Sequence, residues 1–456
     1  MSSRHISRRG FCGGALAASS LMAAGIPARA LAAAGRAPTG TPANVQVTHD
    51  SYSVHVEPCL AVNPSDPRNM LASCELDIRM GAYASFDGGQ SWQSTGPLPL
   101  PAGALGGGNM SAGFDATGRG LVCGLVVHSG TGKALPRGVW AWRTGDGGRT
   151  FAEPVQVAAY GPSVDRPWLA IEPQLPGTAH VVWAQGPNSN FSSINAVGYA
   201  RSTDGGKTFS APRIIASVPR GLGDPMVACG PAGGVYVIYG VGPGVGGADP
   251  LQTTRTPPQT AMAATVVCSH DGGQTFGRPI TLGHGTINVV FPGQNNLCDS
   301  MPAIAADPHT GLVCAVYTVH KAGARHADVM LTASRDGGRT WTAARAVTPH
   351  DQLIYFQPQV AIDNAGRTGV MAYAMSPGGL ISVVLMLSRP GSLRLGPPIT
   401  VTSAPFNPAQ SEGPRWELGN YQALATTPGA FHPLWTDTHT GKLELFTAAV
   451  RSGGEV

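Results

Sequence analysis

The chain has 456 residues, including 62 glycines and 39 prolines, and only 12% of its residues are charged. Its 30 lysines and arginines exceed its 26 aspartates and glutamates, but four of the arginines lie in the first 34 residues, which hold no acid. The remainder is neutral, which argues against a nucleic-acid-binding surface. The density of turn-forming residues is typical of an all-β protein.

The chain opens with an export leader. Ser7-Arg8-Arg9-Gly10-Phe11 resembles the twin-arginine motif, an apolar run of small residues follows at 12–26, and Ala28-Arg29-Ala30 is a plausible cleavage site. We therefore assign residues 1–34 to a twin-arginine (Tat) signal peptide. The mature protein is expected to be periplasmic or secreted and to have no membrane span.

Seven inner strands predict the architecture of the remaining chain. Each is an apolar segment that ends in a turn, and the segments align on Ala61, Gly113, Ala170, Ala228, Ala305, Ala361 and Ala425. The intervals suit four short strands each. We expect an all-β propeller of seven four-stranded blades in one domain, residues 43–452. The seventh blade lacks a fourth strand, and the N-terminal stretch 45–48 is expected to supply it and close the ring.

A second motif recurs five times after the third strand of a blade. It has the form [ST]-x-D-G-G-x-[ST]-[WF], and its aspartates are Asp87, Asp146, Asp204, Asp271 and Asp336. The aspartate accepts backbone N–H groups and the glycines supply positive φ, so each copy predicts a tight turn. Because these turns join strands three and four, they lie on the face opposite the inner-strand N-termini. We expect all five aspartates to be structural.

These copies resemble the Asp box of the sialidase-like (BNR-repeat) β-propellers, and the fold resemblance covers nearly the whole mature chain. The familiar members have six blades, so six is the alternative to seven. The family's early Arg-Ile-Pro motif is absent, and Arg166-Pro167-Trp168 is only a faint counterpart. The resemblance therefore implies the fold more strongly than the activity.

The candidate site is the ring of residues that open the inner strands. Four residues before each alignment point stand Glu57, Asn109, Arg166, Asp224, Met301, Gln357 and Tyr421. Six of these seven are polar, and unlike polar groups around a concave mouth are suited to a glycan or another small polar ligand. The candidates beside this ring are Asp165, Arg79, Arg415, Trp416 and Asn420, with Asp299 nearby.

The sialidase resemblance implies a role for each of these groups. Tyr421 would be the nucleophile, Glu57 would draw its proton, and Asp165 would be the acid. The substrate carboxylate would be held by Arg166, Arg415 and Arg79. The remaining substrate-binding candidates are Asp224, Asn109, Gln357, Asn420 and Trp416.

Two main functions follow as alternatives. One is an exported exo-sialidase-type glycoside hydrolase acting on acidic sugars of glycans. The other is a non-catalytic propeller that binds a glycan or a protein at the cell surface, and an assembly factor for another exported protein is a weaker third. We expect a monomer. The seven cysteines after the leader form no C-x-x-C pair, so no metal site or cofactor is predicted.

Overall fold

The computed structural model describes residues 41–129, 135–161, 163–188, 193–219, 221–243, 261–286, 288–290, 297–321, 324–411 and 418–452. The predicted leader lies outside these residues, as do two candidates for the site, Arg415 and Trp416. Everything below concerns the compact unit that begins at Gly40.

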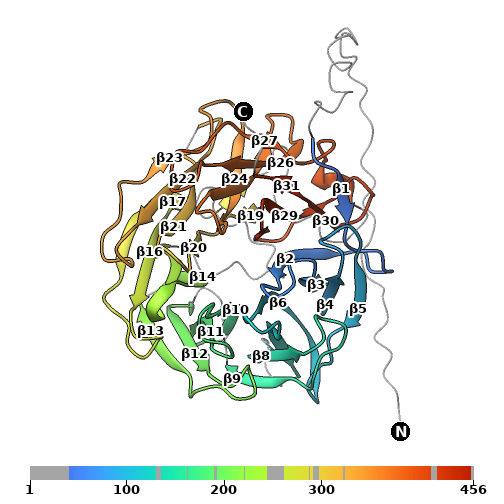
Figure 1. Cartoon of the computed structure of the whole chain (residues 1–456), viewed down its shortest axis with the longest axis vertical. Coiled ribbons are helices and arrows are strands. Elements are labelled where there is room, and N and C mark those ends of the chain that lie inside the picture. Colours follow the sequence, from blue (N-terminus) through green and yellow to red (C-terminus); the bar gives the residue numbers. More distant parts are fainter. Residues whose placement is uncertain are drawn as a thin grey trace, which may run out of the picture. The chain divides into compact units, whose positions relative to one another are not determined.

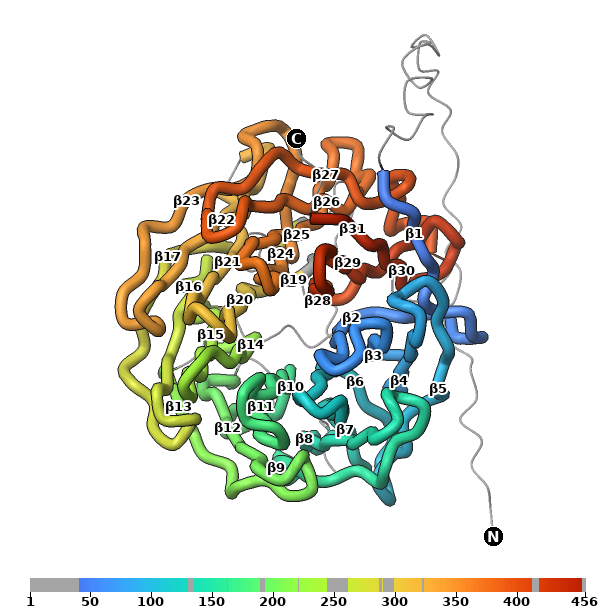
Figure 2. Tube along the Cα trace, in the orientation of Figure 1, coloured from blue at the N-terminus to red at the C-terminus, as the bar shows by residue number. Residues whose placement is uncertain are grey.

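Seven sheets of four antiparallel strands form a ring, so the protein is a seven-bladed β-propeller (Figures 1 and 2). Within each of the first six blades the strands pair in chain order. The first three blades are β2 (His55–Val62), β3 (Met70–Leu76), β4 (Arg79–Ser85) and β5 (Gln93–Pro97); β6 (Ala104–Phe114), β7 (Gly120–His128), β8 (Arg137–Thr144) and β9 (Val155–Gly161); and β10 (Ser163–Ile171), β11 (Ala179–Gly186), β12 (Ala196–Ser202) and β13 (Arg213–Ser217).

Blades four to six continue the same pattern. They are β14 (Leu222–Cys229), β15 (Val235–Val241), β16 (Ala261–Ser269) and β17 (Ile280–Thr286); β20 (Ala303–Ala306), β21 (Val313–Val319), β22 (Asp328–Ser334) and β23 (Arg345–Ala346); and β24 (Ile354–Ile362), β25 (Thr368–Met375), β26 (Ile381–Leu387) and β27 (Ile399–Thr400). A two-stranded hairpin, β18 (Asn288–Val290) and β19 (Leu297–Asp299), stands before blade five and has no counterpart in the repeat.

The seventh blade joins the two ends of the propeller. Its strands are β28 (Ala423–Thr427), β29 (Ala430–Asp437), β30 (Glu444–Ala448) and, as the fourth, β1 (Asn44–Gln46), while the short β31 (Val450–Arg451) pairs with β29. Val45 lies opposite Thr447, and the N–H of Val47 donates to the carbonyl of Leu445. The predictions of seven blades and of closure by the N-terminal strand are confirmed, and the six-bladed alternative is wrong.

Burial follows strand position within a blade. The second strands are packed between neighbouring blades, so β15 and β25 are almost entirely buried. The fourth strands lie at the rim, and β5 is mostly exposed. Apolar runs therefore form the middle strands, and three tryptophans, Trp142, Trp183 and Trp435, are almost fully buried between blades.

The five predicted turns follow the third strands β4, β8, β12, β16 and β22. In one of them the Asp204 carboxylate accepts the backbone N–H groups of Lys207 (3.0 Å) and Thr208 (2.9 Å) and the hydroxyl of Thr208 (2.6 Å). Partial burial raises the pKa of Asp204, but the bonds from Thr208 and Ser202 outweigh it and lower the pKa to about 2. The other four aspartates bond in the same way within their own turns.

We expect Asp204→Ala to lower the free energy of unfolding by about 1–2 kcal/mol, because two backbone N–H groups lose their acceptor. Since the folded-state pKa is below that of the unfolded chain, the stabilisation is complete above pH 4 and is lost as the pH falls toward 2. Urea unfolding at pH 7 and pH 3 measures both effects. Lys207→Ala in the same turn is the control, and an equal loss in that variant would contradict the role of the carboxylate.

Two negative findings apply to the described residues. None of the helices among them is long and apolar enough to cross a membrane. Six cysteines in these ranges, Cys59, Cys74, Cys123, Cys229, Cys268 and Cys314, are buried free thiols.

Candidate functional site

The candidate site is built from one backbone distortion that recurs in five inner strands. The strands β2, β6, β10, β14 and β24 each contain a register shift. At each shift one residue has a left-handed φ of 48–60°, and these residues are Glu57, Asn109, Arg166, Asp224 and Gln357. They are five of the seven ring positions predicted from the sequence.

This backbone is strained, and the strain is informative. A left-handed conformation costs a residue with a side chain about 1–2 kcal/mol. Four of the five precede a proline, a position that disfavours helical backbone. Such strain persists only where the surroundings impose it, and it concentrates at functional sites. Of the four side chains other than that of Arg166, that of Asp224 contacts Arg166 directly, and that of Asn109 contacts Glu57.

Arg166 is the centre of the site. Its Nε lies 3.0 Å from a carboxylate oxygen of Asp224, and its Nη2 lies 2.9 Å from one of Asp299. Asp165 is 3.9 Å from the same Nε, and Arg137 is 4.0 Å from the other oxygen of Asp165. Blades three and four and the β18–β19 hairpin thus converge on one guanidinium.

Acidic side chains outnumber basic ones at this site, and this imbalance together with burial shifts the pKa values of the acids. Burial raises the pKa of Asp224 to about 7; the charge of Arg166 opposes the shift, and those of Asp299 and Asp165 add to it. Burial also raises the pKa of Asp299 and of Glu57, again against the charge of Arg166. For Arg166, burial lowers the pKa, but the four carboxylates outweigh burial and raise it. These three carboxyl groups therefore bind protons more tightly than isolated carboxyl groups do.

Side-chain amides hold Glu57 and the neighbouring backbone. The Glu57 carboxylate accepts hydrogen bonds from the amides of Asn109 and Asn420, the latter at 2.8 Å. The Gln357 amide donates to the carbonyls of Asp299 (3.0 Å) and Gly419 (2.6 Å). Residues from blades one, two, six and seven are thereby joined to the hairpin that carries Asp299.

Tyr421 and Trp168 form the apolar part of the site. Their rings meet edge to face with centroids 5.2 Å apart. Tyr421 is only 2% exposed, and its hydroxyl donates to the carbonyl of Met110 at 3.4 Å. Burial raises the pKa of Tyr421 well above its usual value, and the charge of Glu57 adds to this.

The predicted residues therefore divide into two groups. The first group lies in the network around Arg166 and Glu57 and comprises Glu57, Asn109, Asp165, Arg166, Asp224, Gln357 and Asn420. Tyr421 lies beside this network, where it contacts Trp168 and the carbonyl of Met110. Arg79 is exposed at the start of β4, where it pairs with Leu76 across the β3–β4 hairpin. Among the residues that the structure describes, Arg166 is thus the one predicted arginine in contact with the acids. Asp299 reaches Arg166 because the β18–β19 hairpin carries it there. This hairpin has no counterpart in the other blades, so aligning the blades does not predict the contact.

Comparison with known proteins identifies the fold. No family model and no curated protein sequence matches the chain. Among solved structures, the BP39L lectin from Burkholderia pseudomallei aligns with a TM-score of 0.54 at 12% identity, over 89% of this chain and 98% of that one. An ulvan lyase of polysaccharide lyase family PL25 has a TM-score of 0.52 at 10% identity, over 89% and 96% of the two chains.

The Hadza microbial sialidase Hz136 aligns less well, with a TM-score of 0.45 at 13% identity over 86% of this chain and 76% of that one. An overlap this low carries no argument about activity. At such identities a structural likeness shows the fold alone. The chain is similar to these proteins as a β-propeller, in agreement with its own strand order.

Proposed function

We propose that this protein binds a carbohydrate at its central mouth and hydrolyses a glycosidic bond there, with Asp165 and Asp299 as the two acting carboxyl groups. The observation that carries the proposal is the cluster of four acids, Glu57, Asp165, Asp224 and Asp299, around the guanidinium of Arg166. Glycoside hydrolysis needs one protonated and one ionised carboxyl group on either side of the bond. Burial raises the pKa of Glu57, Asp224 and Asp299, and carboxyl groups in unlike environments are the usual source of an acid and a base in one site.

The two acids whose side chains are most exposed are the ones that a substrate can reach. The Asp165 and Asp299 side chains are 14% and 21% exposed, whereas those of Asp224 and Glu57 are about 5% exposed or less. Both acting carboxylates lie beside the same guanidinium, at 3.9 Å (Asp165) and 2.9 Å (Asp299), so they can face one bound sugar together. Asp299, with its raised pKa, would protonate the leaving oxygen. Asp165 would act as base or nucleophile.

The remaining groups would bind and orient the sugar. The amides of Asn109, Asn420 and Gln357 can exchange hydrogen bonds with hydroxyl groups. Trp168 offers an apolar surface of the kind on which sugar rings pack. Two propellers of like fold, a lectin and an ulvan lyase, are named for carbohydrate ligands, which is compatible with this proposal.

An exo-sialidase-type reaction is the second candidate. In its favour, Glu57 is near enough to Tyr421 for its charge to affect the hydroxyl. In that version Tyr421 is the nucleophile, and Arg166, Arg79 and Arg415 hold the substrate carboxylate. Against it, Arg166 already faces acids, so an anionic sugar would meet net negative charge. The carboxylate mechanism with a neutral sugar is therefore our first proposal.

Tyr421→Phe separates the two mechanisms. We expect the variant to keep kcat within about threefold of wild type on a neutral glycoside, since only a buried hydroxyl is removed. The measurement is a kinetic panel of neutral and sialic-acid glycosides with both proteins. Sialoside hydrolysis that disappears in Tyr421→Phe would establish the second candidate instead.

Binding without cleavage is the remaining outcome of that panel. Wild-type protein that binds glycans on an array but turns over no glycoside would overturn both catalytic proposals and favour the binding module. Export through the twin-arginine pathway and a monomeric state remain predictions from the sequence.

A further inference from the structure

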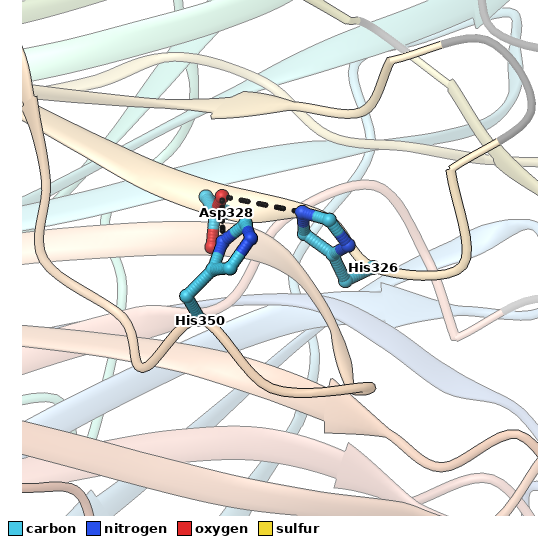
Figure 3. A group of neighbouring side chains, drawn as sticks. All are labelled: His326, Asp328 and His350. Atoms are coloured by element: carbon cyan, nitrogen blue, oxygen red, sulfur yellow. Dashed lines mark ion pairs between the residues drawn. The ribbon is translucent and has the colours of Figure 1, made fainter.

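A second cluster of ligand-type side chains, which includes none of the residues around Arg166, lies at blade five (Figure 3). His326 and Asp328 stand two residues apart at the start of β22, and His350 lies in the segment between β23 and β24. Nitrogen and oxygen atoms of the three side chains all lie within 4.8 Å of one another. Two imidazoles and one carboxylate are a common ligand set for Zn²⁺ and related divalent ions.

The two histidines face the same carboxylate oxygen. Nε2 of His326 lies 3.9 Å and Nδ1 of His350 lies 3.6 Å from Oδ2 of Asp328. Their rings meet edge to face with centroids 4.2 Å apart. Tetrahedral zinc with bonds near 2 Å separates its ligand atoms by about 3.3 Å. The two observed N···O distances exceed this value by less than 1 Å, so small rotations of the side chains would bring the three ligand atoms to zinc-binding geometry.

Neighbouring groups orient Asp328 for this role. Its other oxygen, Oδ1, accepts a hydrogen bond from the Thr348 hydroxyl at 3.2 Å, and that hydroxyl accepts the backbone N–H of Val329 at 3.1 Å. The carboxylate is thereby held with Oδ2 toward the histidines. Such outer hydrogen bonds typically fix the ligands of a metal.

The three side chains are partly exposed, so an ion can reach them from solvent. The side chains of His326, Asp328 and His350 are 31%, 17% and 78% exposed. The exposed His350 ring can close onto an ion without disturbing the core, and the open side leaves a fourth position for water or a ligand.

We propose that His326, Asp328 and His350 form a binding site for a divalent transition-metal ion, Zn²⁺ in the first place. The ion would link the third strand of blade five to the segment leading into blade six. Asp328 pairs with Val319 at the end of β21, so the site lies at the end of blade five where β20 begins. That is the face of the mouth, opposite the Asp336 turn. The inference does not depend on the proposed hydrolysis.

Equilibrium dialysis of the untagged full-length protein against ZnCl₂ tests the site. We expect one Zn²⁺ per chain with micromolar or tighter affinity, a higher Tm with zinc than without, and visible absorption bands of four-coordinate geometry when Co²⁺ replaces Zn²⁺. His326→Asn and His350→Asn should each weaken binding at least 100-fold. Thr348→Val should weaken it about tenfold, since it only orients Asp328.

A matched control is available in His439→Asn. His439 also lies beside an aspartate, with its Nδ1 2.7 Å from Asp437, but has no second histidine in the described structure around it. This variant should bind zinc like wild type. Circular dichroism of every variant without metal establishes that each is folded. Stoichiometric binding that survives in the double variant His326→Asn/His350→Asn, or no binding by folded wild-type protein, would overturn the proposal.

Discussion

We expect Arg166→Met to lower the free energy of unfolding by about 3–5 kcal/mol at pH 7, because the change leaves buried carboxylates without their cation. The guanidinium contacts Asp224 and Asp299 at 3.0 and 2.9 Å, and its charge also acts on Glu57. A loss of this size is a large fraction of the stability of an ordinary domain.

The stability lost in Arg166→Met should increase with pH. The pKa of Asp224 is already about 7, above the value near 3.9 of an unfolded aspartate, so this group destabilises the folded state progressively between pH 4 and 7. Without Arg166 the pKa values of Asp224 and Asp299 rise further. Relative to wild type, the deficit of the variant then grows as the pH rises through 7, where Asp224 ionises in the wild-type protein but stays protonated in the variant.

Urea unfolding at pH 5 and pH 8 measures this difference. Arg68→Met is the control, because its side chain is 76% exposed and pairs with Asp66 outside the acid cluster, and it should cost less than about 1 kcal/mol. A deficit of Arg166→Met that is the same at both pH values would contradict the account of a proton-sharing acid cluster.

Asp299→Asn should lower kcat by about 10²–10⁴-fold on a neutral glycoside, the usual contribution of a general acid. The asparagine oxygen can still accept from Nη2 of Arg166, so folding and KM should change little. In wild type, kcat/KM should decrease at alkaline pH as the Asp299 carboxyl group loses its proton. This decrease should be absent in Asp299→Asn, which has no carboxyl group at this position. Steady-state kinetics from pH 4 to 9 provide the measurement.

The leaving group of the substrate distinguishes an acid from a merely structural residue. A glycoside with a nitrophenolate leaving group needs little protonation, so its rate should fall far less in Asp299→Asn than that of a sugar leaving group. Asp204→Asn, in a turn on the opposite face, should leave kcat unchanged. Equal losses on both substrates would assign Asp299 to positioning and overturn its role as the acid.

Local chemistry explains why the fold was predictable. In each turn of the Asp204 type, the serine, threonine and glycine residues of the motif form the hydrogen bonds that hold the turn. Eight consecutive residues are therefore enough to predict its structure. The inner strands repeat at intervals set by four strands and their turns, which gave the seven blades. The missing fourth strand of the last blade identified residues 45–48 as its partner, since an open edge strand is disfavoured.

The site was predictable only in part. Position in the repeat identified Glu57, Asn109, Arg166, Asp224 and Gln357, but the left-handed backbone at these residues runs against the preference of a residue that precedes proline. Only packing against neighbouring blades can impose it. Likewise, the resemblance to sialidases implied that Arg166 binds a substrate carboxylate, whereas the fold surrounds it with Asp165, Asp224 and Asp299.

The sequence by itself determined the number of blades, the closure of the ring and the turns on one face, because these depend on short-range hydrogen bonding and on regular strand lengths. The tertiary structure alone decided which side chains meet. Asp299 reaches Arg166 from 133 positions away through a hairpin outside the repeat, and His350 reaches Asp328 from the segment that leads to the next blade. Such contacts arise from how whole blades pack, and no spacing along the chain encodes them.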